Sequence, residues 1–167
     1  MSVVIKNIGE FHGQMSAWLA GVKDVAAEAA MGLAHDTFEQ ILTTAPQNSG
    51  DFVANTHVAV GAPSTAPFES EVVGPIGEEM FHVGSTPAME HARAQADWTP
   101  GKLGQSVFIS SSAEHDEPYA VKIEEGLINL RPANAGADHI YRNAVAHTAR
   151  TNVRIGKDQL AKLRRIT

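Results

Sequence analysis

The chain has 167 residues, of which 43% are hydrophobic and 19% charged, the size and composition of one folded domain. It contains no cysteine, which excludes disulfides, thiolate metal sites and a cysteine nucleophile. Because no apolar run approaches the roughly 20 residues of a membrane span and the first residues do not form a secretory signal, we expect a soluble intracellular protein with no membrane association.

Charge is distributed unevenly along the chain. The formal net charge is −6, but residues 150–167 carry +5, so that residues 1–149 carry −11. We therefore expect a single domain over residues 1–149 and a basic tail over residues 150–167, whose deletion leaves the fold intact and weakens assembly. Such a tail either docks on an acidic neighbour or nucleic acid, or is a solvated helix end. Its candidate contact residues are Arg150, Arg154, Lys162, Arg164 and Arg165.

The N-terminal quarter predicts a strand followed by a long helix. Residues 3–5 are a short β-branched run, typical of an edge strand. From about Glu10 to Thr44, apolar residues recur at helical spacing, along a stripe of Trp18, Val22, Val25, Ala29 and Leu33. The segment 45–51 contains Pro, Asn, Ser and Gly and ends the helix.

Short strands are predicted in the middle of the chain. Residues 52–61 alternate between two faces, which is the pattern of a strand. Residues 71–74 are a second candidate, and residues 106–111 alternate in the same way as the first. Residues 119–125 form a further short structured piece, which a glycine ends.

Two more helices are predicted. Thr86-Pro87 has the chemistry of a helix start, with Thr as the N-cap and Pro in the first helical position, and this helix reaches Asp97. The last helix begins near Asp138.

The sequence lacks the common patterns of catalytic and metal sites. None of the eight histidines forms H-E-x-x-H, and neither common phosphate-binding glycine loop occurs. Ser110-Ser111-Ser112 is not a nucleophile elbow, and adjacent acidic residues such as Glu124-Glu125 do not normally converge on one substrate atom. We therefore predict a protein that is not an enzyme, with no catalytic, cofactor-binding or metal-binding residue. The acidic body also argues against sequence-specific DNA binding.

The order of several motifs resembles the tail-completion family of tailed bacteriophages. The run A-P-Q-N-S-G-D-F at residues 45–52, followed by a strand ending in H-V-A-V-G at 57–61, is similar to the family's P-x-D-T-G-x-L segment and strand. Downstream, P-G at 100–101, the strand at 106–111 and P-Y-A-V-K-I-E-E-G at 118–126 are similar to its "P-G, strand, Y-A-x-x-[IVL]-E-Y-G" block. The family includes head–tail joining and tail-terminator proteins, also described as minor tail components.

This resemblance implies a fold, a function and partners. The implied fold is α+β, with a small, mostly antiparallel sheet, a long N-terminal helix packed across it and a C-terminal helix. The implied protein is a non-catalytic structural ring, usually of six copies, that joins or terminates the tail at the neck of the virion and is assembled in the bacterial cytoplasm. Its partners would be further copies of itself, the adjacent connector and tail-tube proteins, and genomic DNA that passes through without sequence-specific contact. No cofactor is implied.

Individual residues receive two competing interpretations. Trp98 and Tyr119 are candidate interface anchors, because buried aromatic side chains contribute much of the binding energy at interfaces, and the alternative for both is core packing. Turn geometry is the expected role of Pro46, Ser49, Gly50 and Gly126.

Two alternatives to the ring remain from other functional classes. One is a small, non-enzymatic protein-binding module of phage or prophage origin, which would stay monomeric or dimeric. The other is a metal-dependent hydrolase that uses some of the eight histidines and would hold stoichiometric metal.

Overall fold

One long helix forms the axis of the molecule. A computed structural model describes residues 7–45, 50–67, 86–99, 105–112 and 140–165, except the side chains of 151–156, 160 and 163. Helix α1 (Ile8–Thr44) has 37 residues and spans about 55 Å. Beside it lie, in chain order, α2 (Asp51–Ala54), β1 (Thr56–Val60), α3 (Pro87–Gln95), β2 (Val107–Ser111) and α5 (Ile140–Leu163).

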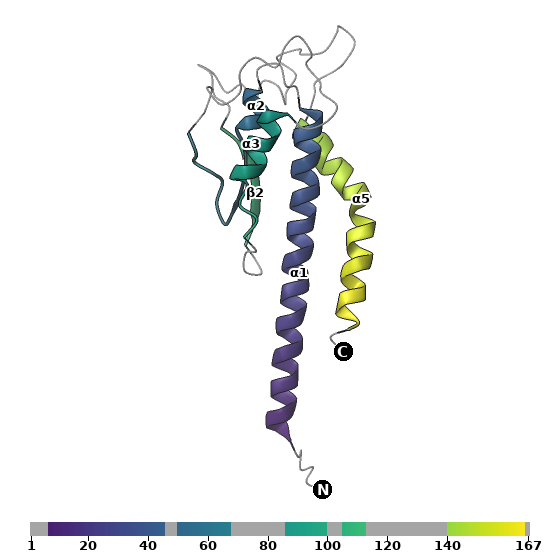
Figure 1. Cartoon of the computed structure of the whole chain (residues 1–167). Coiled ribbons are helices and arrows are strands. Elements are labelled where there is room, and N and C mark those ends of the chain that lie inside the picture. Colours follow the sequence, from purple (N-terminus) through teal and green to yellow (C-terminus); the bar gives the residue numbers. More distant parts are fainter. Residues whose placement is uncertain (1–6, 46–49, 68–85, 100–104, 113–139, 166–167) are drawn as a thin grey trace.

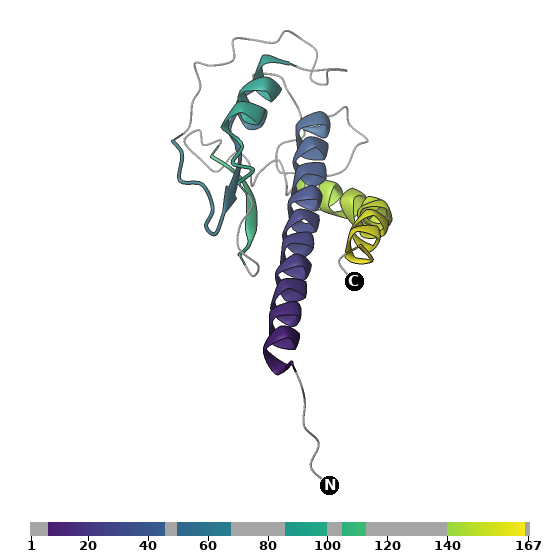
Figure 2. The same cartoon turned by 60° about the horizontal axis from the view of Figure 1, so that its bottom comes forward.

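Helix α1 separates two groups of elements (Figures 1 and 2). The strands, α2 and α3 lie on one side of its C-terminal half, and α5 lies on the other side, running back along α1 in the opposite direction. Strands β1 and β2 pair antiparallel, with Val58 opposite Ile109. These elements confirm the expected α+β fold with its antiparallel strands, long N-terminal helix and C-terminal helix.

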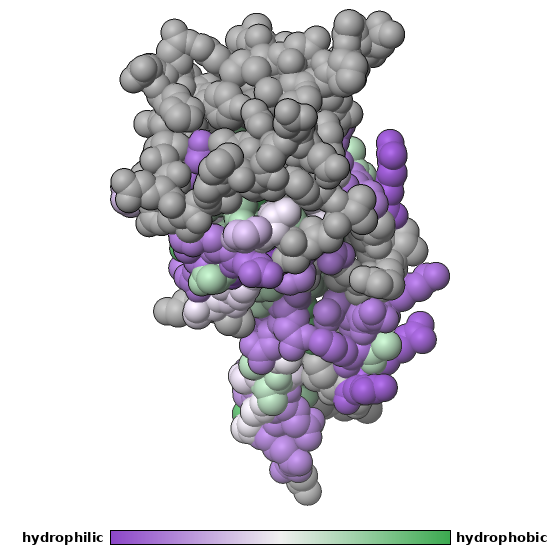
Figure 3. All heavy atoms as spheres, turned by 45° about the horizontal axis from the view of Figure 1, so that its top comes forward, coloured by the Kyte–Doolittle hydropathy of each residue, from purple (hydrophilic) through white to green (hydrophobic). Residues whose placement is uncertain are grey.

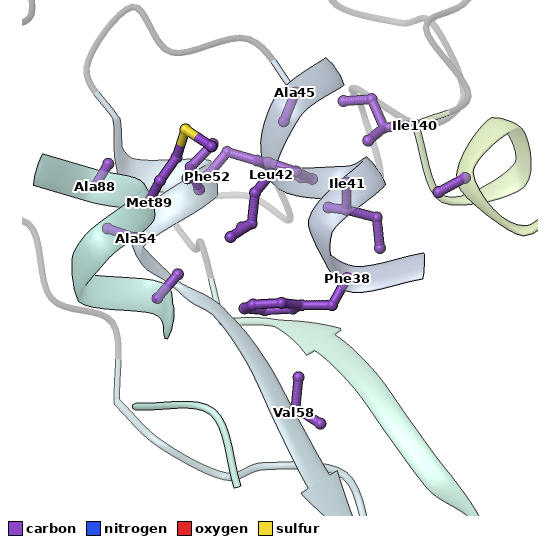
Figure 4. Close-up of a cluster of buried hydrophobic side chains, with 13 residues drawn as sticks. Phe38, Ile41, Leu42, Ala45, Phe52, Ala54, Val58, Ala88, Met89 and Ile140 are labelled. Carbon is purple, nitrogen blue, oxygen red and sulfur yellow. The ribbon is translucent and has the colours of Figure 1, made fainter. Parts of the chain in front are cut away.

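The buried core sits at the C-terminal end of α1 (Figure 4). Phe38, Ile41 and Leu42 of α1 are completely buried. They pack with residues of α2, β1, α3 and the start of α5, namely Phe52, Val53, Ala54, Val58, Ala88, Met89, Ala92, Ile140 and Ala144. Each large side chain in this cluster stabilises the fold by roughly 1.5–3 kcal/mol through the apolar surface that it removes from water.

The predicted helix start at residue 86 is confirmed. The Thr86 side-chain oxygen accepts a hydrogen bond from the Met89 backbone N–H at 3.3 Å, and Pro87 occupies the first turn. Thr86 satisfies a donor that the helix itself cannot pair, and proline has no such donor to satisfy. The helix ends at Gln95, two residues before the predicted Asp97.

The strand predicted over residues 52–61 is only partly correct. Residues 51–54 form the short helix α2, and the strand begins at Thr56. Phe52, Val53 and Ala54 are all buried, so this segment has no exposed face for an alternating strand to present. The turn is closed by the Asn55 side chain, which donates to the Asp51 carbonyl at 2.9 Å, and by the Thr56 hydroxyl, which donates to the Phe52 carbonyl at 2.8 Å.

The boundary predicted after residue 149 falls inside α5. This helix continues without interruption to Leu163, so residues 150–163 are its second half and not a separate tail. Lys162, near its end, pairs with Glu28 of α1. The basic residues do not form a separate tail because they lie on a helix that packs against α1, whose charged residues are mostly acidic.

The remaining predicted elements are partly outside the described residues. The helix predicted from Glu10 begins at Ile8, and the predicted strand at 106–111 is β2. The final helix, predicted from about Asp138, is described from Ile140. The strands predicted at 3–5 and 71–74 and the piece at 119–125 lie outside the described residues.

Candidate interaction surface

A buried polar cluster joins α2 to the end of β2. His57 Nε2 lies 3.0 Å from the Ser112 hydroxyl oxygen, and the Ser112 backbone N–H donates to the Asn55 carbonyl at 3.0 Å. His57 is 4% exposed and Asn55 is 1% exposed. A serine–histidine pair can form part of a nucleophilic site, but here the histidine side chain is enclosed, and the hydrogen bonds satisfy polar groups that burial would otherwise leave unpaired. The cluster therefore fixes the joint between α2 and the sheet.

A second polar contact ties α1 to α3. Arg93 Nε donates to Glu39 Oε1 at 2.9 Å, and Arg93 Nη2 donates to Glu39 Oε2 at 2.7 Å, which is a bidentate pair. The hydrogen bond from Arg93 lowers the pKa of Glu39, and the same bond raises the pKa of Arg93. The pair lies at the half-buried edge of the core and supports α3 in its position.

The surface around α1 and α5 has the features of an interaction site. Helix α1 carries five acidic residues and one Lys, whereas α5 carries five basic residues and one Asp. The two helices make the most extensive contact between any two described elements. Beyond the Glu28–Lys162 pair, Arg142, Arg150 and Lys157 of α5 are exposed, against one exposed acidic residue, Asp158. The described surface of α5 is therefore positively charged.

The N-terminal half of α1 exposes large apolar side chains. Ile8, Phe11, Met15, Trp18 and Leu19 are between 42% and 58% exposed, and we call these five residues the α1 stripe. In Figure 3 this half of the helix projects from the lower end of the molecule, with hydrophobic and hydrophilic residues side by side. Large exposed apolar patches are typical of contact surfaces, so the stripe is a candidate contact surface.

The candidate anchor Trp98 packs on the core. Its ring centroid is 5.5 Å from that of Phe38, in an edge-to-face arrangement, and 5.0 Å from that of His35. It is partly buried. These contacts support the core-packing interpretation for this residue.

The other residues singled out from the sequence are dispersed. Gly50 precedes α2 with a φ of 79°, in the left-handed region that glycine enters at low cost, which agrees with its expected turn role. Arg150, Arg154 and Lys162 lie on α5, where Lys162 binds Glu28, and Arg164 and Arg165 follow the helix end. The predicted positions that lie outside the described residues are Pro46, Ser49, Tyr119 and Gly126.

Sequence reasoning missed the first part of the α1 stripe. The stripe was expected to begin at Trp18, but Ile8, Phe11 and Met15 continue it toward the N-terminus. Their spacing of three and four residues was the available signal. Only Ile8 lies before the predicted helix start near Glu10, because the helix begins already at Ile8, whereas Phe11 and Met15 lie within the predicted helix.

Metal sites, membrane spans and known relatives give no further indication of function. Among the described residues, no group of three or more His, Asp or Glu side chains is placed to hold a metal ion. No helix in the same part of the chain has both the length and the apolarity that crossing a membrane requires. Compared with protein-family models, curated proteins and solved structures, the chain matches none of them. The geometry and charge of the surface around α1 and α5 are therefore the features that bear on function.

Proposed function

We propose that the chain is a structural subunit of a tailed-bacteriophage neck, which assembles with copies of itself into a ring around the DNA channel and joins or terminates the tail there. The observation that supports this proposal most directly is the separation of charge. The basic face of α5 lies on a chain whose residues 1–149 carry −11. A basic helix surface on a chain whose other residues are acidic in sum would allow each copy to bind the next one head to tail.

Such a head-to-tail contact uses two different patches and closes when the rotation between neighbours divides a full turn. Exposed Arg150 and Lys157 are available on α5 to face acidic side chains of a neighbour. Exposed charges of this kind steer and orient association more than they strengthen it, so apolar contacts must accompany them. An acidic ring also suits a DNA channel, since it repels the phosphates of passing DNA and does not hold them.

The experiment is a measurement of mass by light scattering on the purified full chain, over a range of protein and salt concentrations. We expect a species near six times 17.8 kDa at low salt. We expect its mass to fall as the salt concentration rises, because the screening length shortens from about 10 Å at 0.1 M to about 3 Å at 1 M.

A pair of charge reversals tests the role of α5. The double variant Arg150→Glu and Lys157→Glu should reduce the assembled fraction at least tenfold, whereas Lys23→Glu, which reverses an exposed charge on α1, should change it little. The ring proposal is wrong if the chain stays small under all conditions and negative-stain images show no added density when connector and tail proteins are supplied. That result would favour the alternative of a small binding module.

A further inference from the structure

The N-terminal half of α1 extends past the end of its partner helix. Lys162, in the last turn of α5, pairs with Glu28, so residues 8–24 continue beyond the point where α5 ends (Figures 1 and 2). Val25, at this boundary, is 8% exposed, whereas Trp18, two turns earlier, is 42% exposed. The described structure covers one half of α1 and leaves the apolar side chains of the other half in water.

The spacing of the apolar residues is the same in both directions. They occupy positions 8, 11, 15, 18, 22 and 25, with alternating steps of three and four residues, which is the seam of a two-helix coiled coil. When two such helices lie antiparallel with their midpoints between residues 16 and 17 aligned, positions 11, 15, 18 and 22 of one copy meet the same four positions of the other. Ile8 then lies beside Val25, which is already buried in the single chain. Met15 then meets Trp18 of the second copy, and Phe11 meets Val22.

Charge does not oppose this pairing. The three charged residues between positions 8 and 25 are Glu10, Lys23 and Asp24, and helical geometry places all of them on the flanks away from the seam. The positions directly beside the seam are uncharged, namely His12, Gln14, Leu19 and Gly21. The pairing therefore buries no charge, and it covers Leu19, which is 47% exposed in the single chain.

A lipid surface is a poorer occupant. Helices that lie in membrane interfaces carry Lys and Arg on their polar face, and this segment carries one Lys against two acidic residues. A second copy matches the segment in apolar pattern, length and charge.

We propose that two copies of the chain pair antiparallel through residues 11–22 of α1, with Met15 and Trp18 of each copy at the centre. The contact is isologous, because both copies use the same patch, so it stops at two. It goes beyond the proposed ring, which needs a contact between two different patches, and it stands whether or not the ring forms.

The absence of cysteine allows a direct test with thiol crosslinking. Chains with Phe11→Cys and chains with Val22→Cys are mixed and treated with a short bismaleimide. Residues 11 and 22 meet in the antiparallel register, so the mixture should give a covalent dimer. Each chain alone should give little, because two copies of residue 11 lie about 16 Å apart along the axis. Efficient crosslinking of the Phe11→Cys chain alone would indicate a parallel pair and overturn the proposal.

The double variant Phe11→Cys with Val22→Cys separates this contact from the ring. A two-fold pair closes on itself, so the largest covalent product should be a dimer, whereas a head-to-tail contact through the same helix would give a ladder of larger products. A ladder, or no product from the mixture of the two single variants, would overturn the proposal without bearing on the charge reversals in α5.

A matched pair of variants gives a second readout. At high salt, where the charged head-to-tail contact is screened, Trp18→Glu should halve the mass seen by light scattering, from a pair to a single chain. Ala17→Glu adds the same charge at an exposed neighbouring position off the seam and should leave the mass unchanged. Equal masses for the wild type and Trp18→Glu, with unchanged helical circular dichroism, would contradict the pairing.

Discussion

Glu39 and Arg93 form a bidentate ion pair that holds α1 against α3. Their side chains are 29% and 35% exposed, so solvent screens the pair and its contribution to stability is up to about 1 kcal/mol. The hydrogen bond from Arg93 lowers the pKa of Glu39 from its ordinary value of 4.5. The contribution is therefore complete above pH 4.5 and is lost as the pH falls through the lowered pKa, where the folded state must take up the proton.

Replacing Glu39 with Gln should remove this pH dependence. We expect Glu39→Gln to lower the free energy of unfolding by up to about 1 kcal/mol at pH 7, and we expect this difference from the wild type to shrink as the pH falls below 4.5. Urea denaturation at a series of pH values measures both. Asp24→Asn, at an exposed position in the middle of the same helix, is the control and should match the wild type at pH 7. A constant difference between Glu39→Gln and the wild type over the whole pH range would exclude the ion pair as its cause.

The two ends of helix α1 have different surroundings, and two leucines report the difference. Leu42 is completely buried in the core, whereas Leu19 is 47% exposed on the α1 stripe. We expect Leu42→Ala to lower the free energy of unfolding by about 2–5 kcal/mol, because it leaves a cavity among packed side chains. Leu19→Ala should cost less than about 0.5 kcal/mol at protein concentrations where the chain is monomeric. Equal costs, measured by urea denaturation, would show that the core does not end where the structure places it.

At the scale of the whole molecule, α5 joins the core to the charged surface. Its first residues, Ile140 and Ala144, belong to the core, and Thr148 is joined to Thr37 of α1 by a hydrogen bond of 2.9 Å. Its second half carries four of the five basic residues of α5 and ends beside Glu28. Residues 150–163 therefore combine packing on α1 with the charge that we assign to assembly.

Truncation after residue 149 should accordingly destabilise the fold, and not leave it intact as the sequence suggested. We expect a loss of about 1 kcal/mol or more, since Val25 at the end of the α1–α5 contact would become exposed and the remaining part of α5 is short for an isolated helix. Truncation after Leu163 is the control and should melt like the full chain. Thermal melting followed by circular dichroism measures the change. Identical melting of both truncated chains would mean that residues 150–163 act in assembly alone.

Local patterns in the sequence were sufficient for several elements. The N-cap chemistry of Thr86-Pro87 predicted the start of α3, and the apolar periodicity predicted most of α1, since both depend on neighbours within one or two turns. The uneven distribution of charge also follows from the sequence alone, because it is a property of the order of residues along the chain.

Other features depended on contacts between distant residues. The alternation over residues 52–61 predicted a strand, but the first part of this segment forms the helix α2, because the core buries Phe52, Val53 and Ala54 together. Helical periodicity also does not show where the partner of a helix ends. The apolar row on α1 was therefore predicted from its spacing alone, and the spacing does not show that α5 covers only part of that row. The sequence by itself determined which residues of α1 are apolar and how they are spaced. The tertiary structure decided which of them α5 covers and which remain in water for a second chain, because the burial of a residue depends on the length and placement of the helix that packs on it.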